Sequence, residues 1–205
     1  MTEYKRIRYE VRDRVAEITM IREPVNAIDM LLAQEVVDAY GRVREDPEVR
    51  GVILTSDCKA AFSAGMDLKM IRGKTGLDLR NFLEVLYFGM HDAQYRLGKP
   101  SIAAVTAPAR AAGVTLAVSC DMIVAADDID LSYPEIDVGV IPAMHYVHLP
   151  RRLNRVVLGQ IVQPPELIVR PKLTPVRSWR PVFPFLRHCD FSLMSNPGDV
   201  SRQRR

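Results

Sequence analysis

The stretch Ala109–Asp127 reads Ala-Arg-Ala-Ala-Gly-Val-Thr-Leu-Ala-Val-Ser-Cys-Asp-Met-Ile-Val-Ala-Ala-Asp and predicts the centre of the fold. The apolar run 101–107 before it is typical of a buried strand, and small residues follow as far as Gly113. Apolar residues 114–118 then predict a short buried helix, and 121–126 a further strand. A strand, a small-residue turn and a helix start direct free backbone N–H groups into the turn. Such a turn could hold an enolate oxygen, or could only allow strand and helix to pack tightly.

A second turn of small residues, Lys59–Lys69, reads Lys-Ala-Ala-Phe-Ser-Ala-Gly-Met-Asp-Leu-Lys and follows the β-branched run Gly51–Thr55. The two turns resemble the first and second signatures of the crotonase family, the enoyl-CoA hydratase/isomerase superfamily. The third signature is similar to Tyr133-Pro134-Glu135-Ile136 with Gly139 and Ile141-Pro142. The three motifs stand in the family's order, and the resemblance covers residues 5–155.

The first hundred residues alternate between strand and helix patterns. Residues 7–11 and 15–21 predict a hairpin. Asp29 predicts the N-cap of a helix that Pro47 closes, and 79–98 predict a long second helix. Strands that alternate with helices favour an α/β fold. The resemblance implies, more specifically, a crotonase-like ββα spiral core.

Composition divides the chain near Pro150–Gly159. Residues 1–150 hold 17 basic and 22 acidic side chains, whereas the last 55 residues hold eleven basic and three acidic ones and seven of the 14 prolines. Proline at that density disfavours helices. We therefore expect an acyl-CoA-binding core over 1–155 and an atypical, irregular, Pro/Arg-rich basic tail over 156–205, in place of the usual helical lobe. A shifted reading frame or the replacement of a lost lobe would produce such a change.

The same composition limits the expected partners and location. No apolar run is long enough to span a membrane and the N-terminus has no apolar signal region, so we expect a cytoplasmic protein without a membrane partner. The arginines of the tail have neither helical nor strand spacing, so no nucleic-acid partner is predicted. The three cysteines fit no disulfide framework or zinc pattern, no metal site is predicted, and Cys120 is expected to be buried. The resemblance implies a homotrimer or hexamer.

The resemblance implies an oxyanion hole formed by the backbone N–H groups of Met66 and Ala112. Family members usually have glycine at the second position, but alanine still supplies the N–H. The substrate would be an acyl-CoA, so coenzyme A arrives as part of the substrate and no separate cofactor is expected. The residues alone leave open that Met66 is part of the core and Asp67 a helix cap. The implied substrate contacts are Ala64, Met66, Asp67, Leu68, Lys69, Ala112 and Thr115.

The acid–base groups decide which reaction is expected. Hydratases of the family use two glutamates; one matches Glu135, whereas Thr115 stands in the place of the other. A hydroxyl of ordinary pKa is no general base near neutral pH. One carboxylate suffices to move a proton between the α and γ carbons of an enoyl thioester, so double-bond isomerisation by Glu135 is favoured. Hydration is the alternative, and a non-catalytic CoA-binding or oligomerisation scaffold is the alternative of another class.

Other branches of the family depend on residues after Glu135. Dienoyl-CoA isomerases and chlorobenzoyl-CoA dehalogenases resemble each other in an aspartate where this chain has Ala143, which argues against both reactions. His145 and His148 are alternative bases because histidine titrates near neutral pH. They could equally be packed or solvated histidines, and Glu135 could be a merely exposed acid.

Overall fold

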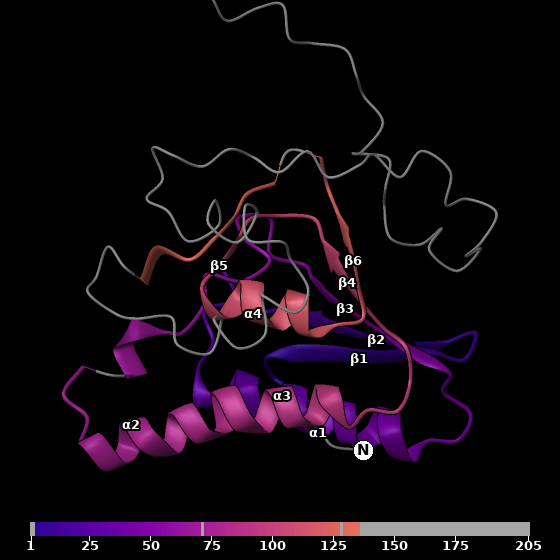
Figure 1. The fold of residues 1–205 in the computed structure, drawn as a ribbon, viewed down its shortest axis with the longest axis horizontal. Coiled ribbons are helices and arrows are strands. Elements are labelled where there is room, and N and C mark those ends of the chain that lie inside the picture. Colours follow the sequence, from indigo (N-terminus) through magenta and orange to yellow (C-terminus); the bar gives the residue numbers. More distant parts are fainter. Residues whose placement is uncertain (1–2, 71, 128, 136–205) are drawn as a thin grey trace, which may run out of the picture.

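The computed structural model of the 205-residue chain describes residues 3–70, 72–127 and 129–135. They form a five-stranded sheet in the order β1-β2-β3-β4-β6. Helices line one side of it (Figure 1). The first two strands form an antiparallel hairpin and the rest of the sheet is parallel. The α/β fold predicted from the sequence is thus confirmed. The strands are β1 (Ile7–Arg12), β2 (Val15–Met20), β3 (Gly51–Ser56), β4 (Ser101–Val105) and β6 (Met122–Ala125).

The predicted hairpin closes through Asp13 and Arg14, which have φ angles of 50° and 66°. Two consecutive left-handed residues match the right-handed twist of the strands that they connect. The predicted first helix is α1 (Met30–Glu45), where the Asp29 side chain accepts a hydrogen bond of 2.8 Å from the Leu32 N–H. Helix α1 turns a buried stripe, which includes Leu32, Val36 and Val43, towards β1 and β2.

The second helix differs from the expected 79–98. It starts earlier, as α2 (Gly76–Leu83), because Thr75 and Asp78 form a capping box. A π-helical turn, Glu84–Gly89, then connects α2 to α3 (Met90–Tyr95). The wider π-helical turn changes the direction in which its side chains project relative to a regular helix.

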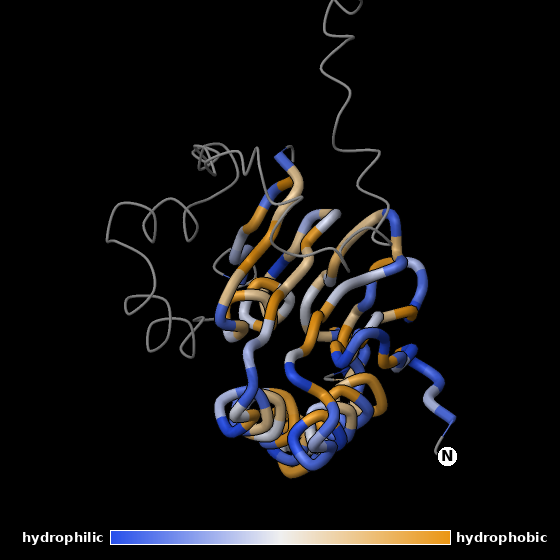
Figure 2. The backbone as a smooth tube through the Cα atoms, turned by 90° about the vertical axis from the view of Figure 1, so that its right-hand side faces the viewer, coloured by the Kyte–Doolittle hydropathy of each residue, from blue (hydrophilic) through white to orange (hydrophobic). Residues whose placement is uncertain are grey.

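The core lies between the sheet and the helices. The short helix α4 (Ala112–Ser119) is predicted correctly and is buried from its first residue to Val118, between α3 and β4 (Figure 1). Figure 2, turned by 90°, shows the long helices nearly end-on in one layer and the strands in another. Cys120 is buried, as expected. A second, two-stranded parallel sheet pairs β5 (Ala109–Arg110) with β7 (Leu131–Ser132).

The described residues bear on the expectation about membrane spans, but they do not include the predicted tail or the two candidate histidines. None of the helices in 3–70, 72–127 and 129–135 is both long and apolar enough to cross a membrane. The predicted basic tail, 156–205, lies outside the described residues, as do His145 and His148.

Candidate active site

The first small-residue turn is held by backbone hydrogen bonds around Met66. The N–H of Ile28 donates to the carbonyl oxygen of Gly65 at 2.7 Å, and the N–H of Asp67 donates to the oxygen of Ile28 at 3.0 Å. Met66 therefore forms a parallel bridge with Ile28, in which its neighbours provide the bonds and its own N–H is directed to the other side. The turn is closed by Gly65, whose φ of +86° is costly for residues with a side chain.

The second turn places Ala112 at the start of α4. The N–H of Ala111 donates to the carbonyl oxygen of Ser132 in β7 at 2.9 Å. Ala111 itself has φ 52° and ψ −124°, a conformation usually reserved for glycine that costs about 1–3 kcal/mol. It turns the chain so that Ala112 is the first helical residue, and the first N–H groups of a helix have no partner within it.

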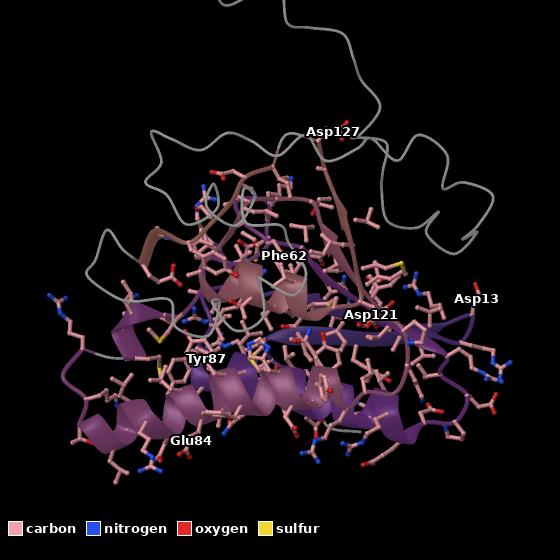
Figure 3. All side chains as sticks on the ribbon, in the orientation of Figure 1. Asp13, Phe62, Glu84, Tyr87, Asp121 and Asp127 are labelled. Carbon is pink, nitrogen blue, oxygen red and sulfur yellow. The ribbon has the colours of Figure 1, made fainter. Side chains whose placement is uncertain are left out.

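The two turns pack directly on each other. Added to Gly65, a Cβ atom would lie 2.7 Å from the Cβ of Ala111 and 3.2 Å from the backbone nitrogen of Ala112. The N–H of Phe62, the residue labelled beside α4 in Figure 3, donates to the oxygen of Pro108 at 2.9 Å. The peptide units of Met66 and Ala112 are therefore brought side by side, from positions 46 residues apart in the sequence.

Beside this pair of turns lies a group of polar side chains. The Oγ1 atom of Thr115, on the first turn of α4, is 3.3 Å from the hydroxyl of Tyr133. Burial raises the pKa of Tyr133; the hydrogen bond with Thr115 opposes this effect, and the negative charge of Glu135 adds to it. Burial raises the pKa of Tyr87 too, again with a contribution from the charge of Glu135. The charge of Glu135 thus acts on two phenols, the buried Tyr133 and the half-buried Tyr87, which projects from the π-helical turn (Figure 3).

Asp67 faces inward rather than into solvent. Its Oδ2 atom lies 2.6 Å from Nη2 of Arg22, whose Nε is 2.9 Å from Oδ2 of Asp29. The Oδ1 atom of Asp67 accepts a hydrogen bond of 3.0 Å from the N–H of Lys69. Burial acts to raise the pKa of Asp67, but the hydrogen bonds from Lys69 and Arg22 outweigh it, so that the pKa is lowered. Asp67 therefore ties the Met66 turn to the start of α1.

The remaining predicted substrate contacts form an exposed rim to the first turn. Ala64, Leu68 and Lys69 are exposed, and Leu68 shows 62% of its surface although it is apolar. Met66 is half-buried, and Ala112 and Thr115 are buried. The structure thus separates the implied contacts into an outer rim and an inner pair of turns. Within the described residues, no cluster of three or more His, Cys, Asp or Glu side chains could hold a metal ion.

Comparison with known proteins identifies the family. The family described as enoyl-CoA hydratase/isomerase matches residues 10–167, which is more than half of the chain. The chain belongs to the enoyl-CoA hydratase/isomerase family. The resemblance to the crotonase superfamily is thereby confirmed.

Relatives within the enoyl-CoA hydratase/isomerase family are longer than this chain. The carnitinyl-CoA dehydratase of Proteus mirabilis is 32% identical over 152 residues, which are 74% of this chain and 58% of the relative. That of Escherichia coli K12 is 34% identical over 149 residues, 72% of this chain and 56% of the relative. The chain therefore spans little more than half the length of these relatives.

Solved structures of the family have the same fold. The enoyl-CoA hydratase of Mycobacterium smegmatis aligns with a TM-score of 0.70 and 28% identity, over 80% of this chain and 63% of its own. The enoyl-CoA hydratase of Bacillus anthracis aligns with a TM-score of 0.72 and 26% identity, over 77% and 62%.

Three residues of this family member were missed by the sequence prediction: Arg22, Tyr87 and Tyr133. Tyr133 lies within the third signature but was not assigned a role there. The sequence carries no signal for Tyr87, because its position depends on the π-helical turn, or for Arg22, whose partner lies 45 residues further along the chain.

Proposed function

We propose that this chain transforms acyl-CoA thioesters and that its favoured reaction is the isomerisation of a carbon–carbon double bond. The observation that carries the proposal is the packing of Gly65 against Ala111 and Ala112, which brings the turns of Met66 and Ala112 together. The backbone N–H groups of Met66 and Ala112 would then lie side by side, and Glu135, whose charge acts on Tyr133, would be the nearby carboxylate. Membership of the enoyl-CoA hydratase/isomerase family supports the substrate class.

The two N–H groups would serve as the oxyanion hole. When a proton leaves a carbon conjugated to the thioester, the electron pair moves to the thioester oxygen and forms an enolate. Donors about 2.7–3.1 Å from that oxygen, on Met66 and Ala112, would stabilise the charge without reorganising, because backbone hydrogen bonds already hold both turns. The half-buried position of the turns lowers the local dielectric constant and strengthens this interaction.

Glu135 would act as the proton shuttle. Its carboxylate removes a proton from one carbon, and the resulting carboxylic acid returns it to the carbon two positions along the chain, so the substrate gains and loses no atoms. This step needs one base only. Thr115 and Tyr133, whose hydroxyl groups contact each other, would remain neutral and take no proton from a carbon.

The substrate would enter across the exposed rim of the first turn. Ala64, Leu68 and Lys69 are exposed there and would contact the coenzyme A portion of the thioester. Asp67 would act indirectly, by holding the turn to Arg22. The predicted assembly as a homotrimer or hexamer stays a prediction.

A second candidate, reversible addition of water to an enoyl-CoA, is favoured by the names of the relatives, which are carnitinyl-CoA dehydratases and enoyl-CoA hydratases. It would require a water molecule beside Glu135 at the place where Thr115 replaces a carboxylate. A non-catalytic scaffold that binds acyl-CoA is the remaining alternative.

One experiment separates the three candidates. The full chain is incubated with a β,γ-unsaturated acyl-CoA and, separately, with its α,β-unsaturated isomer, and the products are resolved by mass spectrometry and chromatography. We expect interconversion of the two isomers and little hydroxyacyl-CoA. A hydroxyacyl product as the main product would establish hydration instead. Binding of both acyl-CoAs by calorimetry without any turnover would establish the scaffold.

A further inference from the structure

We propose that Tyr133, through its contact with Thr115, determines which reaction this site performs. The side chain of Tyr133 fills the space in which a carboxylate at position 115 would hold a water molecule beside Glu135. The inference rests on the proposed acyl-CoA chemistry and deepens it by naming the residue that excludes hydration.

The first argument is the direct contact between the two hydroxyl groups. Thr115 Oγ1 and the Tyr133 hydroxyl oxygen are 3.3 Å apart, whereas two oxygens bridged by a water would be separated by about 5 Å. The residues are 2% and 1% exposed, so solvent does not reach them from outside. The space between Thr115 and Tyr133 is thus occupied by their own atoms.

The second argument is that the backbone holds both side chains relative to one residue, Ala111. The pairing of β5 with β7 aligns Arg110 with Ser132, and the Ala111 N–H donates to the Ser132 oxygen at 2.9 Å, directly before Tyr133. The Thr115 N–H donates to the Ala111 oxygen at 3.2 Å. Ala111 is also the neighbour of Ala112, so the phenol is held in register with the proposed oxyanion hole.

The third argument is the chemistry of the phenol. Burial raises the pKa of Tyr133, and the charge of Glu135 raises it further, so the hydroxyl stays protonated near neutral pH. A neutral phenol and a neutral alcohol cannot activate water as a carboxylate does. The pair leaves Glu135 as the single base among the described residues of this site, which is what a proton shuttle between two carbons needs.

The steric part of the inference predicts how the reaction could be changed. Restoring a glutamate at position 115 alone places a larger, charged side chain against a fully buried ring, where it has no room for water. Removing the ring of Tyr133 as well creates space that polar groups line on two sides. A buried site of that kind holds water.

The test compares five variants of the full chain: Thr115→Glu, Tyr133→Ala, Tyr133→Phe, the double variant Thr115→Glu/Tyr133→Ala, and Tyr95→Ala. The measured quantity is the ratio of hydroxyacyl-CoA to isomerised product formed from one α,β-unsaturated acyl-CoA. We expect this ratio to rise about tenfold or more in the double variant and not in Thr115→Glu alone. Tyr133→Phe, which keeps the ring, should shift it less than Tyr133→Ala. Tyr95→Ala, at a tyrosine that is 90% exposed on α3, is the matched control and should leave it unchanged.

Folding and binding are measured alongside by circular dichroism and by acyl-CoA calorimetry. If Tyr133→Ala does not fold, the double variant with Tyr133→Leu, which retains more of the buried volume, replaces it and decides the same question. Wild-type isomerisation together with a double variant that binds acyl-CoA at an unchanged product ratio would overturn this inference alone. A wild-type chain that binds no acyl-CoA would instead overturn the proposed function.

Discussion

A methyl group on Gly113 would lie 2.5 Å from the carbonyl oxygen of Ser63, so these two residues set how closely the two small-residue turns approach. The contact is made to backbone rather than to a flexible side chain, and it cannot be relieved by a rotamer change. The same requirement appears at Gly65, where an added Cβ would meet Ala111. The close approach of the turns that carry Met66 and Ala112 therefore requires glycine, which has no side chain, at both position 65 and position 113.

Gly113→Ala should destabilise the chain by about 1–3 kcal/mol, because the added methyl group forces the two turns apart. Chemical denaturation measures the change in the free energy of unfolding. Gly41→Ala is the matched control: Gly41 lies within α1, where an added Cβ would meet nothing within 4 Å. That substitution should be neutral or stabilise by up to about 1 kcal/mol. Equal effects of the two substitutions would show that the contact with Ser63 does not limit the packing.

Arg22→Met should loosen the first turn, because it removes the cation that lies between Asp29 and Asp67. We expect a loss of about 1–3 kcal/mol in the free energy of unfolding, since both carboxylates are largely buried. Arg80→Met is the matched control, because Arg80 of α2 and Glu84 of the π-helical turn form an exposed pair, and such pairs contribute no more than about 0.5 kcal/mol. If Arg22→Met lowers the free energy of unfolding no more than Arg80→Met does, Arg22 does not hold the first turn to the start of α1.

Asp67→Asn should flatten the loss of stability at acidic pH. A carboxyl whose pKa is lowered on folding stabilises the folded state above its unfolded pKa, which is about 4, and this contribution disappears as the pH falls through the folded pKa. The wild-type chain should therefore lose more stability than Asp67→Asn between neutral pH and pH ~3. Denaturation midpoints measured across that range provide the comparison, and parallel curves would refute the prediction.

Glu135→Gln should reduce isomerase activity by a factor on the order of 10²–10⁴, because the amide cannot accept the proton, while acyl-CoA binding changes little. Thr115→Ala should lower activity far less. Equal losses in both variants would favour a hydratase-like water site. Unchanged activity in Glu135→Gln would transfer the role of base to His145 or His148, whereas no turnover in the wild-type chain would indicate that it is no catalyst.

The chain should lose stability at alkaline pH. Burial raises the pKa of Tyr133, so the folded state holds the phenolic proton more tightly than the unfolded chain, and this contribution is complete below pH ~10 and lost as the pH rises above it. Tyr133→Phe cannot ionise and should lose less stability over the same range. Urea denaturation at a series of pH values measures both slopes, and equal slopes would exclude Tyr133 as a contributor.

Local patterns in the amino-acid sequence are enough to predict the α/β fold, the hairpin, helices α1 and α4, and the two small-residue turns. These features follow from local properties: the alternation of apolar residues, the capping oxygen of Asp29, and glycines where a side chain would clash or be strained. The family resemblance added Met66, Ala112 and Glu135 as site residues, and the structure shows that the first two lie in adjacent turns.

The side chains that surround those turns follow from contacts between segments that are distant in the sequence. Arg22 meets Asp67 only because the loop after β2 and the loop after β3 leave the same edge of the sheet. Tyr133 meets Thr115 only because β7 pairs with β5 in one register, and Tyr87 belongs to this group only because a π-helical turn replaces a regular one. Such contacts depend on the register between distant segments, and a sequence pattern reports only the backbone preferences and burial of residues close to one another in the chain.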